Sequence, residues 1–315
     1  MQAIVMKSLG GPEVLQLADT PAPELPRAHK MITVRSAGVN FSDIHVRTGT
    51  YLGETPLPWI PGNEVLGEDE TGRRVVALTR GGGYAQQTAA HRATMWPVPD
   101  EVSDDQALAL TLQGTTAYHL LHTVLSVTAS DTVVVSAAAG GVGSLAVQLA
   151  ARTGARVVAL ASTPERRALA LDLGATAAAD STADDLTTAV TDAAGGPVTA
   201  VLEMGGGRVH EQLLAALAPR GRMAVYGYAG EAAPAPSSGR LLLERSLTVS
   251  GFWLPSLYPV RGALQTSMNV LFKAVTAGTL RTLTTHTWPL AQAADAHRAL
   301  ESRTVKGKAI LRVDS

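Results

Sequence analysis

The sequence predicts an α/β protein with two domains, one made of short strands and one built on a doubly wound parallel sheet. Two observations indicate this organisation. The first hundred residues contain short β-branched runs separated by turn residues, which is typical of an antiparallel or barrel-like domain. Between Thr132 and Gly251, strand-like and helix-like segments alternate, as they do in successive β-α-β units of a parallel sheet.

Four segments of the first region have the composition of strands: Ile4–Met6, Met31–Arg35, Arg74–Leu78 and Tyr84–Thr88. Six prolines interrupt this region, at Pro21, Pro23, Pro26, Pro56, Pro58 and Pro61. The strands are therefore expected to be short and joined by irregular connections.

The second region begins with a long helix over residues 104–124, for which Ser103 is a suitable N-cap. Strands are then expected at 132–136, 156–161, 198–203, 222–226 and 247–251, and helices at 143–153, 164–173 and 209–217. Ala229–Gly239 is rich in Ala, Pro and Ser and is predicted to be a surface loop. A final helix at 291–303 and a strand from Lys308 are expected to return to the first domain.

Composition excludes several function classes. The chain has 315 residues, of which 46% are hydrophobic and 17% charged, so a packed core is expected and disorder is not. A net charge of −1 argues against general nucleic-acid binding. The absence of cysteine excludes disulfides, thiolate catalysis and cysteine-ligated zinc. We find no signal peptide and no apolar run of membrane-spanning length, so a cytoplasmic protein that binds neither membrane nor nucleic acid is expected.

The most informative motif is the glycine-rich turn after the β-branched run that begins at Val133. Gly140, Gly141, Val142 and Gly143 lie between this run and an Ala/Leu-rich helix, the order that seats a dinucleotide pyrophosphate on a helix N-terminus. Ala138 occupies the place of the first glycine in the usual G-x-G-x-x-G pattern. The turn predicts nucleotide binding, with an ordinary strand–turn–helix as the alternative.

Six segments resemble, in order, the zinc-independent medium-chain dehydrogenase/reductases, specifically the quinone oxidoreductase (zeta-crystallin-like) branch. They are Gly10–Leu15, Ala37–Asp43, Arg47–Tyr51, Gln113–Tyr118, Ala137–Gly143 and Gly307–Lys308. The resemblance implies a GroES-like β-barrel catalytic domain over residues 1–118 and 256–315, and a Rossmann NADPH-binding domain over residues 119–255. It also implies a homodimer formed through the strand at 247–253. The chain departs from the family in a shortened hairpin at 66–75, where Arg73 replaces the usual Asp.

The same resemblance bears on zinc. In the related zinc alcohol dehydrogenases a Cys stands at the position of Asn40, and their Gly-His-Glu segment corresponds to Gly62–Glu64 here. Because an amide is a poor zinc ligand, no metal site is expected. Without a Lewis acid, a simple alcohol is a poor substrate, and an electron-poor quinone, enone or enoyl thioester is favoured. Ser42 and His45 match the proton-relay positions of the zinc branch, although a helix cap and a surface histidine are the alternative for these two.

Counting along the resemblance, Ala161 stands where NAD enzymes carry the acidic residue that binds the adenosine ribose. Ser162 and Arg166 follow, and a hydroxyl with a guanidinium suits a 2′-phosphate, so NADPH is predicted as the cofactor. Arg167 is expected to belong to a solvated first helical turn, and Ser181 replaces a tyrosine that many relatives place near the 2′-phosphate.

The resemblance also implies the residues at the reacting centre. Asn40 would polarise the acceptor carbonyl or hold a tight turn, and Tyr51 would supply the proton or serve as an aromatic lid. Further cofactor contacts are expected from Gln113, Thr116, Gly227, Phe252 and Lys308, although Phe252 and Trp253 could instead serve dimerisation. Asp43 is expected to be structural, and Glu64 to form an ion pair with an unidentified arginine.

The function predicted from these residues is an NADPH-dependent, zinc-independent reductase that transfers hydride to a quinone or another α,β-unsaturated carbonyl acceptor. Two alternatives remain at this point: an enoyl-thioester or enone reductase of a secondary pathway, and an NADPH-binding sensor or interaction protein without activity.

Overall fold

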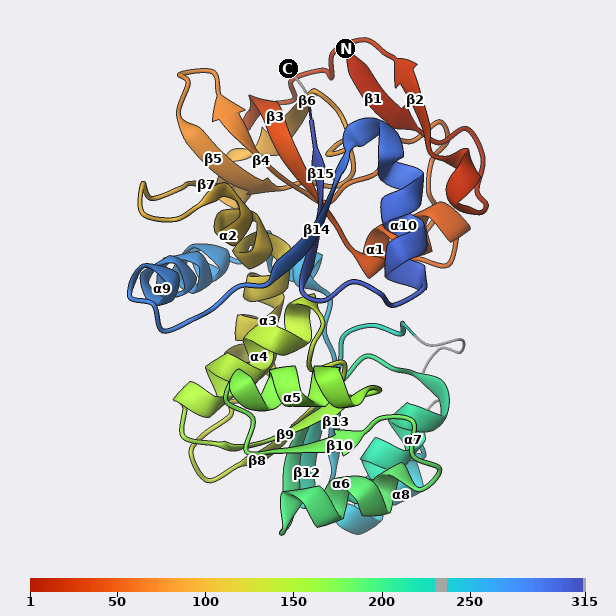
Figure 1. The fold of residues 1–315 in the computed structure, drawn as a ribbon, viewed down its shortest axis with the longest axis vertical. Coiled ribbons are helices and arrows are strands. Elements are labelled where there is room, and N and C mark those ends of the chain that lie inside the picture. The colour runs from red at the N-terminus through yellow and green to blue at the C-terminus, as the bar shows by residue number, and fades with distance from the viewer. Residues whose placement is uncertain (230–236, 314–315) are drawn as a thin grey trace. The chain divides into compact units, whose positions relative to one another are not determined.

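The computed structural model describes residues 1–229 and 237–313 (Figure 1). The chain folds into two compact units: Met1–Gln113 with Tyr258–Ser315, and Gly114–Leu257. Most of the predicted loop Ala229–Gly239 lies outside the described residues. The domain limits predicted from the sequence differ from the limits of these units by a few residues at each point where the chain passes from one unit to the other. The assignment of a catalytic and a cofactor-binding role to the two domains stays a prediction.

The first unit contains a seven-stranded sheet and a separate two-stranded sheet. The large sheet has the order β14-β15-β3-β4-β5-β7, with β6 paired to β3, and every pair is antiparallel except β14 with β15. Its strands are β3 (His29–Val39), β4 (Glu64–Asp69), β5 (Arg74–Leu78), β6 (Gln87–His91), β7 (Met95–Pro97), β14 (Thr284–Pro289) and β15 (Lys308–Arg312). The small sheet pairs β1 (Gln2–Val5) with β2 (Gln16–Asp19).

β3 is the central strand of this unit because it pairs with β4, β6 and β15. Buried and exposed residues alternate from Ile32 to Arg35, as expected for a strand with one face in the core. Its register with β4 shifts between Val34 and Ser36, and every residue from Ser36 to Val39 is buried. The shift re-aims the end of the strand and so places Gly38 and Val39 in a fully enclosed environment.

The helices of the first unit are α1 (Phe41–Thr48), α2 (Asp104–Ala109), α9 (Ala263–Thr276) and α10 (Ala293–Glu301). α1 ends at Gly49, whose φ of 75° is a left-handed conformation that favours glycine. The core of the unit joins apolar residues of the sheet to α10, among them Ile32, Val75, Ala296 and Leu311.

The second unit contains a six-stranded parallel sheet, as the alternating pattern predicts (Figure 1). The strands are β8 (Thr132–Val135), β9 (Arg156–Ala161), β10 (Ala177–Asp180), β11 (Val198–Glu203), β12 (Leu217–Val225) and β13 (Thr248–Gly251). They lie in the order β10-β9-β8-β11-β12-β13, so the direction of winding reverses between β8 and β11. Ligands of doubly wound folds bind at the carboxyl ends of the strands at this reversal.

The helices of this unit are α3 (Thr115–His119), α4 (Gly141–Arg152), α5 (Pro164–Asp172), α6 (Leu186–Ala194), α7 (Gly207–Ala216) and α8 (Gly239–Arg245). Apolar residues of β8, β9 and β11 pack against α6 and α7, including Val134, Leu160, Val190 and Leu213. No helix among residues 1–229 and 237–313 has the length and apolar character needed to cross a membrane.

The structure corrects several expectations about individual elements. The helix predicted over 104–124 is α2 followed by a π-helical turn (Leu110–Gly114), α3 and a second π-helical turn (Leu120–Val124). The strand predicted at Tyr84–Thr88 is instead β6, which begins at Gln87, because the backbone of Tyr84 bonds to Pro61 after a glycine-rich turn. α9 was not predicted, although its buried residues recur at helical spacing.

The shortened hairpin between β4 and β5 closes on Asp69. This carboxylate accepts hydrogen bonds from the backbone N–H and hydroxyl of Thr71 and from the backbone N–H of Arg73, whose guanidinium also pairs with it at 3.1 Å. These bonds hold the pKa of Asp69 well below its usual range. Arg73 is therefore part of a compact turn.

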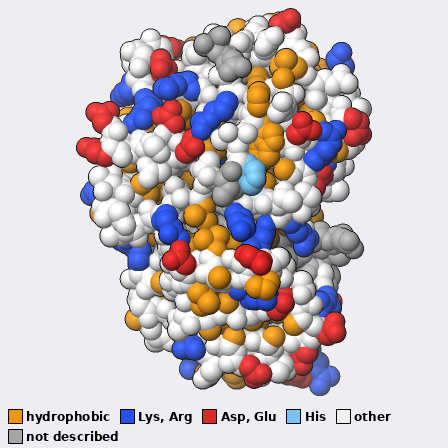
Figure 2. Space-filling view, viewed as in Figure 1, with side chains coloured by type: hydrophobic (Ala, Val, Ile, Leu, Met, Phe, Trp, Pro, Cys, Tyr) orange, Lys and Arg blue, Asp and Glu red, His pale blue; other side chains and the backbone are white. Residues whose placement is uncertain are grey.

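On the face shown in Figure 2, Lys and Arg side chains are interspersed with Asp and Glu side chains.

Candidate active site

Four polar side chains meet inside the first unit, and we call Asn40, Glu64, Gln113 and Lys308 the buried cluster. The Lys308 ammonium forms an ion pair with Glu64 Oε1, and both side chains have no exposed surface. Asn40 Nδ2 donates to Glu64 Oε1 at 2.8 Å, and Asn40 Oδ1 accepts from Lys308 Nζ at 3.0 Å. The ion pair expected for Glu64 is present, but its partner is a lysine and not an arginine.

The local structure explains how the cluster forms. Asn40 is the N-cap of α1 directly after β3, Glu64 begins β4, and Lys308 begins β15. β3 pairs with both β4 and β15, so the sheet brings these three residues together across a wide sequence separation. Gly38 makes the space, because a Cβ there would lie 2.4 Å from Glu64 Oε1 and 2.6 Å from Lys308 Nζ.

Gln113 joins the cluster from the π-helical turn that follows α2. Its Nε2 donates to Asn40 Oδ1 at 3.3 Å, and the backbone N–H of Leu112 donates to Glu64 Oε2 at 2.8 Å. Gln113 Oε1 is buried and has no hydrogen-bond partner in the described structure. An orphaned acceptor of this kind is costly unless a ligand satisfies it, and a ribose hydroxyl or carboxamide of a dinucleotide would do so.

Asp43 extends the polar interior beside the cluster. Asn63 Nδ2 donates to Asp43 Oδ1 at 2.8 Å, while the backbone N–H of Asn40 and the hydroxyl of Tyr84 donate to Oδ2. Burial outweighs these bonds and raises the pKa of Asp43 to about 7. Tyr84 also contacts His297 Nε2 at 3.2 Å, and burial lowers the pKa of this histidine to about 3.

The residues that match the zinc branch have other partners here. Asn63 Nδ2 lies 3.4 Å from Ser42 Oγ, and His45 Nδ1 lies 2.9 Å from Thr50 Oγ1. Asn40, and not Ser42, is the N-cap of α1. Among residues 1–229 and 237–313, no three His, Cys, Asp or Glu side chains gather as metal ligands do.

Tyr51 follows α1, and its backbone N–H donates to the carbonyl of His45 at 3.1 Å. Its side chain is half-buried. Tyr258, which sequence reasoning missed, lies close enough that burial and the charge of ionised Tyr51 both raise its pKa. The guanidinium of Arg80 lies 5.3 Å from the centroid of the Tyr258 ring. The phenols of Tyr51 and Tyr258 and the guanidinium of Arg80 are therefore close to one another in the first unit.

The glycine-rich turn of the second unit has the geometry of a phosphate-binding loop. It joins β8 to α4, with Gly140 as an N-cap that has no side chain to occupy the first backbone N–H groups. Ala137 adopts a left-handed φ of 49°, and a Cβ at Gly143 would lie 2.2 Å from the Ala137 carbonyl oxygen. The turn thus leaves the α4 N-terminus open to an anion at the carboxyl edge of the sheet.

The end of β9 contains the residues expected to select the cofactor. Ser162 is exposed, and Arg166 is half-buried in the first turn of α5, where Thr163 caps the helix by accepting from the Arg166 backbone N–H at 3.3 Å. Arg167 instead donates to the Ala161 carbonyl and pairs with Asp180 at 3.0 Å.

Sequence reasoning missed Asp180, which lies opposite Ala161 in the sheet and places a carboxylate beside the predicted 2′-phosphate position. Hydrogen bonds from the hydroxyl and the backbone N–H of Thr182 hold the pKa of Asp180 below its usual range. The ion pair with Arg167 adds to this effect and offsets the charge of the carboxylate. The alternation of strands along the chain could have revealed this neighbour if β10 had been recognised.

The remaining predicted residues of this unit are spread over its other elements. Thr116 is buried in α3, and Gly227 follows β12. The ring of Phe252 stacks on His119 with centroids 6.4 Å apart, while Trp253 is 44% exposed. Burial lowers the pKa of His119 to about 4, so this imidazole is neutral near pH 7.

Comparisons with known proteins agree with this geometry. Residues 27–100 match the family described as the alcohol dehydrogenase GroES-like domain, and residues 141–272 match the family described as zinc-binding dehydrogenase. A probable quinone oxidoreductase of Schizosaccharomyces pombe is 34% identical, over 98% of this chain and 96% of that protein.

Two solved structures are also similar. The quinone oxidoreductase of Thermus thermophilus, solved also in complex with NADPH, is 37% identical, with a TM-score of 0.87 over 99% of this chain and 100% of that one. The Escherichia coli quinone oxidoreductase complexed with NADPH is 28% identical, with a TM-score of 0.93 over 99% of this chain and 100% of that one.

Proposed function

Since this chain belongs to the zinc-independent quinone oxidoreductase branch of the medium-chain dehydrogenase/reductases, we propose that it reduces a quinone or a similar electron-poor acceptor with NADPH. The net reaction adds one hydride and one proton to the acceptor, which leaves as the hydroquinone or saturated carbonyl, and releases NADP⁺. The observation that carries the proposal is the open α4 N-terminus at Gly140, because relatives with the same fold are complexed with NADPH.

Residues of each unit, taken separately, support this cofactor. Gly140–Gly143 would hold the pyrophosphate, and the orphaned Gln113 Oε1 would accept from the nicotinamide end. Thr116, Gly227, Phe252 and Lys308 stay candidate contacts to the cofactor. When bound, NADPH supplies the hydride, and the chain's own residues supply orientation, hydrogen bonds and a proton path.

Asn40 would orient and polarise the acceptor. Its Oδ1 is held by Lys308 and Gln113, and one Nδ2 hydrogen is held by Glu64, so the plane of the amide is fixed. The second Nδ2 hydrogen has no partner in the described structure and can donate to a carbonyl oxygen as negative charge develops there. The surrounding contacts limit reorganisation of this donor during the reaction.

Tyr51 would deliver the proton directly or through a water molecule. The Tyr51→Phe variant tests this role: kcat for a naphthoquinone should fall by about tenfold to a hundredfold while the KM for NADPH stays within about twofold. An unchanged kcat would exclude the phenol as the acid and leave the aromatic ring as a lid.

The Arg166→Ala variant tests the choice of cofactor. The KM for NADPH should rise by about tenfold or more, because a charge-assisted bond to the 2′-phosphate is lost, while the KM for NADH changes little. Arg240→Ala is the matched control, since this arginine is 86% exposed and pairs with Glu244 within α8. An equal rise for both cofactors would contradict the assignment.

A panel of acceptors tests the function itself. NADPH oxidation is followed with a naphthoquinone, a 2-enone and a 2-enoyl thioester, and turnover of the quinone is expected. Turnover confined to the thioester would support the enoyl-thioester alternative. Saturable NADPH binding without turnover of any acceptor would support a sensor or binding protein.

We further propose that residues 1–118 and 256–315 form the catalytic domain, that residues 119–255 bind NADPH, and that the protein is a cytoplasmic homodimer. β13 supports the dimer because it is the last strand of its sheet and the exposed Trp253 follows it. Light scattering coupled to size-exclusion chromatography should give twice the chain mass of 32.7 kDa. A monomer mass at micromolar concentration would contradict the dimer.

A further inference from the structure

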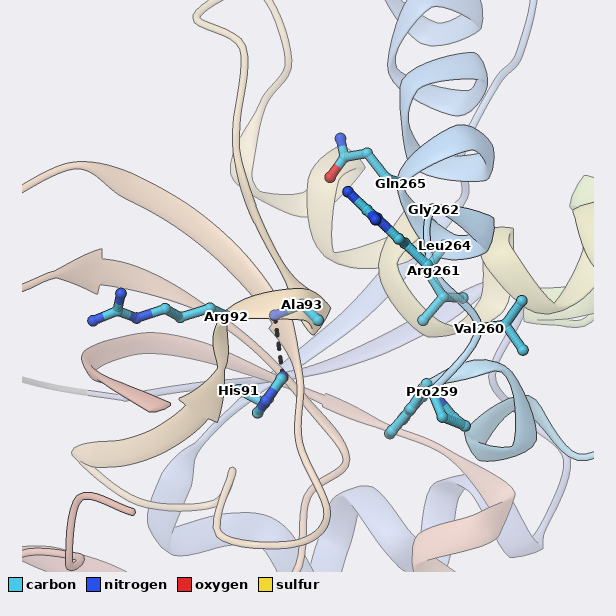
Figure 3. A pocket seen from close by; sticks show the side chains of 10 residues that line it. His91, Arg92, Ala93, Pro259, Val260, Arg261, Gly262, Leu264 and Gln265 are labelled. Carbon is cyan, nitrogen blue, oxygen red and sulfur yellow. Dashed lines mark hydrogen bonds between the residues drawn. The ribbon is translucent and has the colours of Figure 1, made fainter. Parts of the chain in front are cut away.

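The first unit contains a pocket of about 430 Å³ outside the buried cluster (Figure 3). One wall is the segment His91–Ala93 after β6, and the other is the segment Tyr258–Gln265 that leads into α9. This volume is enough for part of a small organic molecule.

The pocket is positively charged, and its charges are uncompensated. Arg92 and Arg261 line it, no Asp or Glu does, and neither arginine side chain has an ion-pair partner in the described structure. Arg80, which stacks on the lining residue Tyr258, also has no ion pair there. A guanidinium that lines a cavity without a counter-charge there, such as that of Arg261, is favourably paired by a bound anion.

The neutral groups of the pocket are also hydrogen-bond donors. Figure 3 shows the side chains of Arg261 and Gln265 extending side by side from the start of α9, whereas Arg92 points away from that helix. His91 Nδ1 accepts from the backbone N–H of Ala93 at 3.2 Å, so a neutral His91 carries its proton on Nε2. Gln265 Nε2 donates one hydrogen to Asn269 Oδ1 at 2.9 Å and keeps its second hydrogen for a ligand. Arg261 is therefore the main candidate contact, Gln265 is the second, and the exposed Arg92 adds a second cation.

Tyr258 connects this pocket to the proposed reacting centre. It lines the pocket, and the guanidinium of Arg80 lies 5.3 Å from the centroid of its ring. Burial and, after it, the charge of ionised Tyr51 raise the pKa of Tyr258, so the two phenols interact electrostatically. An acceptor whose ring lies beside Tyr51 could therefore extend a substituent past Tyr258 toward Arg261.

We propose that the pocket binds an anionic group of the acceptor, such as a carboxylate or sulfonate, and that Arg261 and Gln265 thereby select anionic quinones. This proposal rests on the proposed function in one respect, which is that the bound anion is part of the acceptor. The recognition chemistry is a charge-assisted hydrogen bond from a guanidinium, supported by an amide N–H donor.

The first test compares 1,4-naphthoquinone with 1,4-naphthoquinone-2-sulfonate at saturating NADPH. In Arg261→Gln, kcat/KM for the sulfonate should fall about tenfold and kcat/KM for the neutral quinone less than about twofold. Arg92→Gln/Arg261→Gln should extend the loss for the sulfonate alone. Arg220→Gln, which removes an exposed charge from the other unit, should leave both values unchanged.

The second test measures binding without turnover. Calorimetric titration with 2-naphthalenesulfonate should give a Kd that weakens about tenfold in Arg261→Gln and weakens in the wild type with added salt. Equal losses for both quinones, or an unchanged Kd in the variants, would overturn the proposal. If the wild type reduces neither quinone, the proposed function fails, and the titration alone decides whether the pocket binds anions.

Discussion

The ion pair between Glu64 and Lys308 should be among the most sensitive points of the first unit. Both side chains are fully buried, so neither charge can be hydrated when its partner is removed. In Lys308→Met, the two donors that remain for the Glu64 carboxylate within residues 1–229 and 237–313 are Asn40 Nδ2 and the backbone N–H of Leu112, each at 2.8 Å. Leaving a buried charge unpaired in this way costs about 3–5 kcal/mol of unfolding free energy.

The double variant isolates the pairwise contribution. Glu64→Gln should also lose about 3 kcal/mol, because the buried ammonium then loses the carboxylate that it contacts directly. Glu64→Gln/Lys308→Met removes both charges, so its loss should be clearly smaller than the sum of the single losses, with a coupling of about 2–3 kcal/mol. The predicted pattern is therefore strong non-additivity.

Urea denaturation followed by tryptophan fluorescence provides the assay, since Trp59, Trp96 and Trp288 all belong to the first unit. Lys273→Met, which removes an exposed charge from α9, should change the unfolding free energy by less than about 0.5 kcal/mol. Single losses below about 1 kcal/mol, or losses that simply add, would refute the reasoning that the pair is dry and mutually dependent.

Three further predictions concern neighbouring features. Burial raises the pKa of Asp43 from 3.8 to about 7, so the contribution of this carboxyl to stability is present below about pH 4 and lost as the pH rises to 7. The unfolding free energy of the wild type, relative to that of Asp43→Asn, should therefore decline by about 4 kcal/mol across this range. Parallel pH profiles of the two proteins would contradict this prediction. Gly38→Ala should lower the unfolding free energy by about 1–3 kcal/mol, because the new Cβ would overlap the buried ion pair. Gly196→Ala, which has open space around it, should lower the unfolding free energy by less than about 0.5 kcal/mol in the same urea assay. Gly143→Ala should weaken NADPH binding more than about tenfold in a fluorescence titration, because the new Cβ would lie 2.2 Å from the carbonyl oxygen of Ala137 and displace the turn. An unchanged Kd would show that the turn does not hold the cofactor.

The sequence by itself determined the features that depend on local order. The β-branched run, the glycine turn and the following helix specify β8 and α4, because strand propensity, turn chemistry and helix periodicity act over a few neighbouring residues. The same applies to the Ser103 cap of α2, whose side chain accepts from the Gln106 backbone N–H at 3.3 Å.

The partners of the buried polar residues were decided only by the tertiary structure. Glu64 and Lys308 lie 244 residues apart in the chain, and only the pairing of β3 with β4 and β15 brings them together. Asp180 reaches Arg167 through the parallel pairing of β10 with β9, which no local pattern encodes. Local propensity determines which elements form, whereas the register of strands distant in sequence determines which charges meet, because charges in a dry interior are stable only when they are paired.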